Sequence, residues 1–394
     1  MAKILYCWEM GEGLGHIMSL TMLVGKLKEM GHDVTCVLKN IESAPRLLAP
    51  LGIGWMQSPR VPPLLRRSSS RNHAELLHRV SYGSVDNVMS LFVAWKTIFR
   101  ISGPDLVICD YAPTAALIAG KSGIDVICVD NGFSMPPVNA TNLRAPLPPI
   151  LPGYSHVPEE LADMEERVLV NLNTALARMR MPELPAFASI FRSPVWYRNW
   201  PQLNHFGMHS PDRHLGPIFS EAPGIAPVWP KGKGPKMFAY LKAAHPGSTK
   251  ILRSAIAYGF RVVAFSPDMP DSNIREFSES NRFVFSRVPF NLALLPDDVD
   301  IGVWHSPTGA VGRSIEKGIR MIFLPMHTEQ ILAGTAVARA GLNARIVTRD
   351  CIWTDLFDDL LAVPRKSQAL SWEPADITAF ASKLIMADGG KQHQ

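Results

Sequence analysis

Several patterns that mark particular protein classes are absent from this 394-residue sequence. Its five cysteines form no C-x-x-C pair, and its twelve histidines include no H-E-x-x-H or comparable cluster. Neither a zinc site nor a disulfide framework is therefore indicated. We expect no metal and no cofactor, and reduced thiols in the core of a cytosolic protein. The cysteines are Cys7, Cys36, Cys109, Cys128 and Cys351.

Long apolar runs and a strong excess of charge are also missing. The run Ile4–Trp8 is too short for a signal peptide, and no segment approaches the roughly 18 consecutive apolar residues of a transmembrane helix. The net charge is only +5, with Lys and Arg scattered. This suits anionic small ligands better than a nucleic-acid groove. We expect a cytoplasmic protein without a nucleic-acid partner, and leave open a peripheral contact with the inner membrane face.

The composition is that of a soluble globular protein. Hydrophobic residues make up 47% of the chain and charged residues 19%, which excludes intrinsic disorder. The length is sufficient for two domains with separate cores. The 33 prolines indicate long, shaped loops.

Short apolar runs alternate with helical stretches in the first half. This pattern predicts an α/β domain with a parallel sheet covered on both faces. The predicted strands are Ile4–Trp8, Asp33–Leu38, Leu106–Cys109 and Asp125–Val129, and the helices between them include Gly15–Met30 and Thr114–Lys121.

A segment rich in proline and glycine, Glu221–Lys236, is the best candidate for a linker. After it the alternation restarts, with predicted strands at Met237–Leu241, Arg261–Phe265, Phe283–Phe285 and Ile301–Trp304. We therefore predict two Rossmann-like domains facing across a cleft, at residues 1–220 and 237–372. The tail, residues 373–394, should form a helix that packs back on the first domain.

The most informative stretch runs from Val303 to Gln330. A buried strand ends at His305, and a loop of small residues containing Gly309 leads into a helix. A second strand follows, and then a polar loop closed by Glu329 and Gln330. Backbone N–H groups at a glycine loop and helix start bind phosphate, and an acid–amide pair can hold sugar hydroxyls. The pattern predicts a pocket for a phosphorylated sugar.

Three stretches resemble the GT-B nucleotide-sugar glycosyltransferases, in particular the family of bacterial macrolide and plant natural-product enzymes. They are G-E-G-L-G-H-I-M-S-L at 11–20, P-D-L-V-I-C-D at 104–110, and the run from V-P-F-N-L-A-L-L-P at 288–296 through Gln330. The last is the most specific, because His305, Gly318, Pro325 and Glu329-Gln330 have the family's spacing without a gap. The resemblance implies an inverting, metal-independent transferase with donor ligands among these residues.

The same run departs from the family pattern at three positions. Pro307 replaces a glycine, Ala310 replaces a serine or threonine that contacts phosphate, and Arg313 replaces a glutamate that binds both ribose hydroxyls of UDP-sugars. A dTDP-sugar has no 2′-hydroxyl, and relatives that use it lack this glutamate. We therefore expect a donor other than a plain UDP-hexose, with dTDP-sugars leading and an Arg313–phosphate contact.

The resemblance assigns His16 as the general base and Asp110 as its partner. Both follow predicted parallel strands, where sites of α/β folds lie, and an imidazole suits proton abstraction near neutral pH. Asp110 would hold the His16 tautomer, as in a triad. The alternative is a polar helix start and a strand-end cap. A dinucleotide fingerprint is disfavoured, because His16 stands where G-x-G-x-x-G needs glycine.

Further site residues are expected around these anchors. Gly13, Gly15 and Asn131 should line the acceptor side, although a plain turn would also explain Asn131. Donor contacts are expected from Thr308 and Gly309, from the backbone of Arg287 and Val288 at the nucleobase, and from His245 at the diphosphate. A helix cap is the equal alternative for His245.

Other functions remain open. The basic loop at 60–71 and the helix at 88–101 could form a lid or a membrane-facing surface, or simply a solvated loop and a core helix. One rival is a membrane-associated glycosyltransferase acting on a lipid-linked precursor or polymer. Another is a non-catalytic nucleotide-sugar-binding protein. A nucleotide-sugar 2-epimerase shares the architecture, but Glu329-Gln330 fits transferases better.

Overall fold

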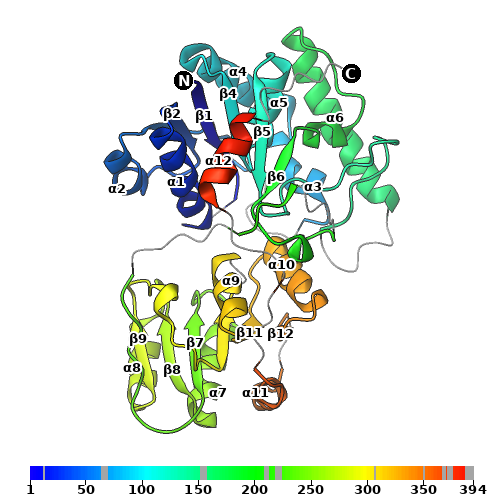
Figure 1. Ribbon diagram of the computed structural model, residues 1–394. Coiled ribbons are helices and arrows are strands. Elements are labelled where there is room, and N and C mark those ends of the chain that lie inside the picture. Colours follow the sequence, from blue (N-terminus) through cyan, green and yellow to red (C-terminus); the bar gives the residue numbers. More distant parts are fainter. Residues whose placement is uncertain are drawn as a thin grey trace. The chain divides into compact units, whose positions relative to one another are not determined.

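The computed structural model describes residues 1–11, 14–63, 70–150, 158–207, 213–217, 224–305, 308–348, 351–365, 370 and 376–386. Gly13 and Pro307 lie outside this range. The chain divides into two compact units (Figure 1). Unit 1 comprises Met1–Ile218 and Pro374–Gln394, and unit 2 comprises Phe219–Glu373.

Within its described part, unit 1 holds a six-stranded sheet in the order β3-β2-β1-β4-β5-β6 with all neighbours parallel. The strands are β1 (Lys3–Trp8), β2 (Asp33–Leu38), β3 (Gly54–Gln57), β4 (Leu106–Asp110), β5 (Asp125–Asp130) and β6 (Val195–Tyr197). The helices are α1 (Leu14–Glu29), α2 (Ala44–Leu47), α3 (His73–Leu77), α4 (Val85–Ser102), α5 (Pro113–Lys121), α6 (Pro158–Arg178) and α12 (Ile377–Met386).

The described part of unit 2 repeats this architecture, with a parallel six-stranded sheet in the order β12-β11-β10-β7-β8-β9. Its strands are β7 (Lys236–Tyr240), β8 (Arg261–Phe265), β9 (Phe283–Ser286), β10 (Ile301–Trp304), β11 (Arg320–Phe323) and β12 (Ala344–Ile346). Its helices are α7 (Gly247–Tyr258), α8 (Asp271–Ser278), α9 (Thr308–Glu316), α10 (Thr328–Arg339) and α11 (Trp353–Ala362). The predicted α/β class with two Rossmann-like sheets is confirmed.

Each sheet has one point where the strand order reverses direction. In unit 1 this point lies between β1 and β4, and in unit 2 between β7 and β10. The chain leaves these two neighbouring strands toward opposite sides, which opens a crevice at their carboxyl ends where open α/β sheets bind ligands. The residues after β1, β4, β7 and β10 are therefore the first candidates for chemistry.

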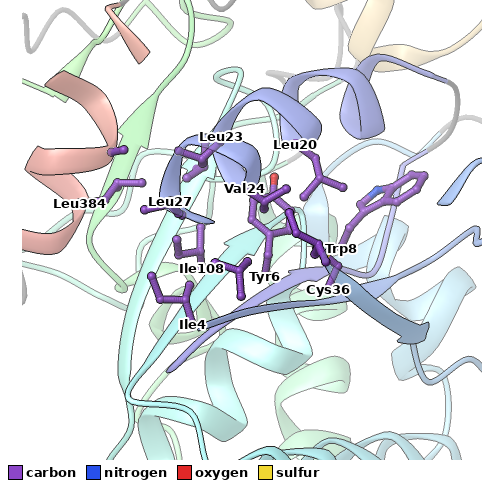
Figure 2. Close-up of a cluster of buried hydrophobic side chains, with 14 of the residues drawn as sticks. Ile4, Tyr6, Trp8, Leu20, Leu23, Val24, Leu27, Cys36, Ile108 and Leu384 are labelled. Atoms are coloured by element: carbon purple, nitrogen blue, oxygen red, sulfur yellow. The ribbon is translucent and has the colours of Figure 1, made fainter. Parts of the chain in front are cut away.

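One hydrophobic cluster of unit 1 lies between its sheet and the helices α1 and α12 (Figure 2). Ile4, Tyr6 and Ile108 from the strands meet Leu23 and Leu27 of α1. Phe380, Ala381 and Leu384 of α12 join the same cluster. The helix α12 is part of unit 1 because its apolar residues pack into this cluster. In the sequence, all of unit 2 (Phe219–Glu373) lies between this helix and the rest of unit 1.

Helix ends in unit 1 follow local chemistry. The hydroxyl of Ser84 caps α4 by accepting the N–H of Asn87, and Gly103 ends the helix in a left-handed conformation (φ 54°). The start of α5 is capped from a distant segment, since the buried Glu9 carboxylate accepts the N–H groups of Thr114 and Ala115 at 2.9 and 3.4 Å and also bonds the Thr114 hydroxyl.

The sequence pattern did not predict several of these elements. The strands β6 and β12 have three residues each, too few to show a period, and α10 begins at Thr328 where a polar loop was expected. Cys7, Cys36, Cys109 and Cys128 are buried thiols, and Cys351 is exposed. In the part of the chain described above, no helix is long and apolar enough to cross a membrane.

Glu9 makes the stability of unit 1 depend on pH. Burial raises the pKa of Glu9 to about 7 from an ordinary 4.5, against the bonds from Thr114 and Ala115. The folded state therefore binds the proton more tightly, and this stabilisation is present below pH 4.5 and lost as the pH rises through 7. In urea unfolding, Glu9→Gln should gain about 3 kcal/mol relative to the wild type between pH 4.5 and 7.5.

Glu165→Gln should show a similar gain in the free energy of unfolding over the same pH range, because burial raises the pKa of Glu165 to about 7 as well. The two gains should add in the double variant, since the carboxyls share no partner. A difference between Glu9→Gln and the wild type that stays constant with pH would contradict this assignment.

Candidate active site

His16 and Asp110 meet at the carboxyl edge of the unit 1 sheet. Asp110 is the last residue of β4, opposite Trp8 at the end of β1, and His16 lies in the first turn of α1. The imidazole Nδ1 lies 3.0 Å from the Asp110 Oδ1, although the two residues are 94 positions apart. The pairing of β1 with β4 therefore brings together the two residues that the sequence singled out.

Asp110 is a fully hydrogen-bonded, buried carboxylate with 1% of its side chain exposed. Besides His16, it accepts the Tyr6 hydroxyl at 2.9 Å on Oδ2 and the Arg198 guanidinium at 3.0 Å on Oδ1. Burial pushes the pKa of Asp110 up, but the charges of Arg198 and His16 and the bonds from His16 and Tyr6 outweigh it, so the pKa lies below its usual value. Asp110 is therefore an anion near neutral pH.

An anionic partner decides the tautomer of His16. A carboxylate can only accept, so Nδ1 of His16 carries the proton that is donated to Asp110. The neutral ring then has its lone pair on Nε2. A Cβ at position 11 would lie 2.6 Å from Nε2, so the imidazole packs against Gly11 at a distance that no side chain allows. Gly11 is also required by its φ of +84°. The Nε2 edge of the imidazole therefore lies against the backbone of Gly11.

Aromatic rings fix the orientation of the imidazole. Trp8 stacks on His16 with ring centroids 5.4 Å apart and planes 18° from parallel. Tyr111 directly follows Asp110. The centroid of its ring lies 6.5 Å from that of His16 and 6.0 Å from that of Phe133. Its φ of 47° is costly for a residue with a side chain. The Tyr111 carbonyl accepts the N–H of Met10, which ties together the loops after β1 and β4.

The remaining acceptor-side residues lie near this edge as well. Gly15 directly precedes His16 in α1, and Gly13 lies outside the described residues. Asn131 follows β5, where its side chain accepts the N–H of Phe133 at 3.1 Å and its carbonyl accepts the amide of Asn199 at 2.5 Å. Asn131 thus forms a turn that joins the loops after β5 and β6, and its acceptor contact stays a prediction.

In unit 2, His305 lies at the strand-order reversal, directly after β10. Its Nδ1 donates to the carbonyl of Leu324 at 2.5 Å, and its Nε2 accepts the N–H of Lys242 at 2.7 Å. Burial lowers the pKa of His305 to about 4, so the ring is neutral. Both nitrogens are engaged by backbone. In this arrangement His305 holds the loops after β7, β10 and β11 together and has no nitrogen left for a phosphate oxygen.

His245, beside His305 with ring centroids 6.0 Å apart, has a free donor. Its Nδ1 accepts the N–H of Gly247 at 3.0 Å, so the ring proton of the neutral form is on Nε2. Burial lowers the pKa of His245, which favours that neutral form. Within the described residues nothing occupies Nε2. His245 therefore presents an N–H next to the start of α7.

The residues expected at the nucleobase lie at the end of β9. The Arg287 side chain folds back onto the carbonyls of Pro267 and Met269 and onto Asp271, at 3.3, 2.9 and 2.5 Å. Val288 is 54% exposed, but its N–H and C=O both bond the Ser286 hydroxyl. A base contact through Val288 stays a prediction. Its N–H would have to leave the Ser286 hydroxyl, whereas its carbonyl has a second lone pair for another donor.

Two helix starts carry the other expected donor ligands. Thr308 and Gly309 begin α9, and Arg313 on the same helix donates to Glu316 at 2.7 Å. Glu329 and Gln330 lie in the first turn of α10, so their assignment to a loop was wrong. The Gln330 oxygen accepts the N–H of Met326 at 2.7 Å, and a sugar contact through its amide N–H₂ group stays a prediction.

Known structures share this architecture along nearly the whole chain. CalG4, the calicheamicin glycosyltransferase, matches with a TM-score of 0.71 at 18% identity, covering 100% of this chain and 99% of that one. The kitacinnamycin glycotransferase matches with a TM-score of 0.69 at 14% identity and coverages of 99% and 96%. VinC, a glycosyltransferase solved with DTDP, matches with a TM-score of 0.61 at 14% identity and coverages of 98% and 99%.

This chain has the GT-B fold. No protein-family model and no curated protein matches the sequence, so the similarity lies in the fold. Within this GT-B fold, both strand-order reversals coincide with the residues that the sequence singled out. In the described part of the chain, no group of three or more His, Cys, Asp and Glu side chains could hold a metal.

Sequence reasoning missed Arg198. It follows β6, a strand of three residues within S-P-V-W-Y-R-N-W, and no motif marks it. The only signal is a charged residue directly after a short apolar run, and that signal is useful only once the strand is known. Tyr6 and Trp8 were missed as well, because both belong to an apolar strand pattern that core packing explains.

His305 and His245 in unit 2 should respond differently to truncation. His305→Ala leaves the Leu324 carbonyl and Lys242 N–H without buried partners, and should lower the free energy of unfolding of unit 2 by about 3 kcal/mol. The matched variant His245→Ala removes the Nε2–H group and one hydrogen bond, that from the Gly247 N–H, so unfolding should change by only about 1 kcal/mol while nucleoside diphosphate affinity falls.

Urea unfolding and calorimetric titration with thymidine diphosphate measure the two effects. A His245→Ala variant destabilised as strongly as expected for His305→Ala, or a His305→Ala variant that keeps full stability and loses only affinity, would reverse these assignments.

Proposed function

We propose that this protein is a glycosyltransferase that moves a sugar from a nucleotide sugar to a hydroxyl group of a small or lipid-like acceptor. The observation that carries the proposal is the His16–Asp110 pair at the strand-order reversal of unit 1. The GT-B fold supports it, since CalG4, VinC and the kitacinnamycin protein are named as glycosyltransferases.

The proposed reaction is a single in-line displacement. Nε2 of His16 takes the proton of the acceptor hydroxyl while the hydroxyl oxygen bonds to the anomeric carbon. The bond between that carbon and the diphosphate oxygen breaks from the opposite face, and the nucleoside diphosphate leaves with the electron pair. The configuration at the anomeric carbon inverts. Asp110 stabilises the imidazolium that forms and holds its ring in place.

Unit 2 supplies the donor contacts in this proposal. The N-terminal turns of α7 and α9 and the Nε2–H of His245 stabilise the leaving diphosphate, so that no metal ion is needed. Glu329 and the amide group of Gln330 bind sugar hydroxyls. Activity that persists in a chelator would agree with this part, and activity restored only by a divalent cation would overturn it.

The donor is proposed to carry thymidine diphosphate. Arg313 stands where UDP-sugar enzymes have a ribose-binding glutamate, and it lies on α9 beside Glu316. An arginine cannot accept hydrogen bonds from ribose hydroxyls, so the 2′-hydroxyl of UDP finds no acceptor in the side chain at this position. VinC, with the same fold, was solved with DTDP.

A donor panel tests function and nucleotide together. The wild type should release nucleoside diphosphate from TDP-glucose faster than from UDP-glucose, with thymidine diphosphate raising the melting temperature more than UDP, GDP or ADP. His16→Ala should lower the release rate about 100-fold or more and leave calorimetric affinity for thymidine diphosphate unchanged. The control His32→Ala, at the amino end of β2, should keep full activity.

Two results would contradict the proposal. A clear preference for UDP-glucose would exclude the thymidine donor. Nucleotide binding without turnover of any donor would indicate a binding protein.

Gly11 provides an independent test of the position of the imidazole. A methyl group at position 11 would lie 2.6 Å from Nε2 and push the ring out of its place beside Asp110. Gly11→Ala should therefore reduce transfer about as strongly as His16→Ala. The matched control is Gly31→Ala, which has the same backbone strain (φ +85° against +84°) but no atom within 4 Å of the new methyl group. Equal rates in the two variants would show that strain alone explains the loss.

A further inference from the structure

Arg198 is built into the site from two sides. Its backbone N–H donates to the Asp130 carbonyl at 2.7 Å at the edge of the sheet, where β6 pairs with β5. Its guanidinium reaches across β5 to the end of β4 and donates to Asp110 Oδ1 at 3.0 Å. The side chain is only 7% exposed. Hydrogen bonds at the backbone and at the guanidinium therefore fix the position of this buried arginine.

The same guanidinium nitrogen lies 3.4 Å from Nδ1 of His16. Nδ1 carries a proton that is donated to Asp110, so Arg198 cannot donate to it. The two groups therefore share one acceptor, Asp110 Oδ1, and face each other as neighbours. When His16 takes up a second proton, two cations stand side by side over a single carboxylate.

Charge counting gives the consequence. A His–Asp pair alone has a net charge of −1 with a neutral ring, and protonation of the ring is favoured by the bare carboxylate. With Arg198 the three groups are neutral before protonation and carry +1 after it. Arg198 thus offsets the pull of Asp110 on the second proton.

We propose that Arg198 is a positioning residue of the transfer reaction, which holds Asp110 against His16 and keeps the base unprotonated at neutral pH. This inference rests on the proposed function, in which Nε2 of His16 takes the acceptor proton. It also implies that His16 gives up its proton readily after transfer, because the imidazolium is repelled by the adjacent guanidinium.

Other groups near His16 do not provide the same effect. The Tyr6 hydroxyl bonds Asp110 Oδ2 without changing its charge, and Tyr111 contributes a ring. Lys39 donates to the Gly11 carbonyl at 2.5 Å, and Glu9 is directed at the start of α5. Among the described groups, only Arg198 places a cation against both members of the pair.

The test follows the His16 Cε1–H resonance with pH in the full-length protein without ligand, assigned with His16→Gln. Arg198→Met should raise the titration midpoint by about one pH unit or more. Arg198→Lys keeps the charge, so its midpoint should stay within about 0.3 pH units of the wild type, while kcat falls because an ammonium group cannot hold Asp110 in the same geometry. An unchanged midpoint in Arg198→Met overturns the proposal.

Tyr6→Phe is the matched control. It removes one hydrogen bond to Asp110 but no charge, and its midpoint should move by less than about 0.3 pH units. Should Arg198→Met fail to fold, Arg198→Gln carries the same expectation, because its amide can still bond Asp110. A shift as large in Tyr6→Phe as in the Arg198 variants would mean a general loosening of the site, and would also overturn the proposal.

The kinetic readout separates this inference from the function itself. With TDP-glucose as donor, the acid limb of kcat/KM should move upward in Arg198→Met by the same amount as the resonance. A shifted resonance in a protein that turns over no nucleotide sugar would overturn the proposed function alone. Turnover with an unshifted resonance and an unshifted acid limb would overturn the role of Arg198 alone.

Discussion

The buried charge of Asp110 is the constraint on which the site in unit 1 depends. A carboxylate without solvent must be fully hydrogen-bonded and balanced by opposite charge. Asp110 meets both needs through His16, Arg198 and Tyr6. These partners come from α1, from the end of β6 and from β1, so one carboxylate ties together segments nearly two hundred residues apart. The orientation of the imidazole follows from this arrangement rather than from α1 alone.

The two units share one sheet topology, but the histidine beside the strand-order reversal has different hydrogen-bond partners in each. In each, a histidine stands at the point where the strand order reverses. In unit 1 the ring bonds a side chain and keeps its second nitrogen open. In unit 2 both ring nitrogens of His305 form hydrogen bonds with backbone groups. The neighbouring His245 bonds the backbone through Nδ1 and carries its ring proton on Nε2. A histidine at a conspicuous position can therefore either contact a ligand or shape the loops that do.

The sequence predicted much of the fold because buried parallel strands are short apolar runs with recognisable ends. The strands β1, β2, β4, β5 and β10 were found with bounds within one or two residues. The three-residue strands β6 and β12 were missed, since three residues carry no period. The start of α10 was mistaken for a loop, because Pro325 and polar residues precede it and no side chain of the Ser, Thr, Asp or Asn type caps it.

The sequence by itself determined the two α/β halves, predicted the pairing of His16 with Asp110 after two strands, and placed Arg313 where the related enzymes have a glutamate. Those features are local, or depend on the fixed edge at which parallel strands end. Only the tertiary structure decided which nitrogen of His16 is open, that His305 is occupied, and that Arg198 joins Asp110. Each of these depends on side chains brought together by strand order and packing, and hydrogen-bond partners across such distances leave no pattern along the chain.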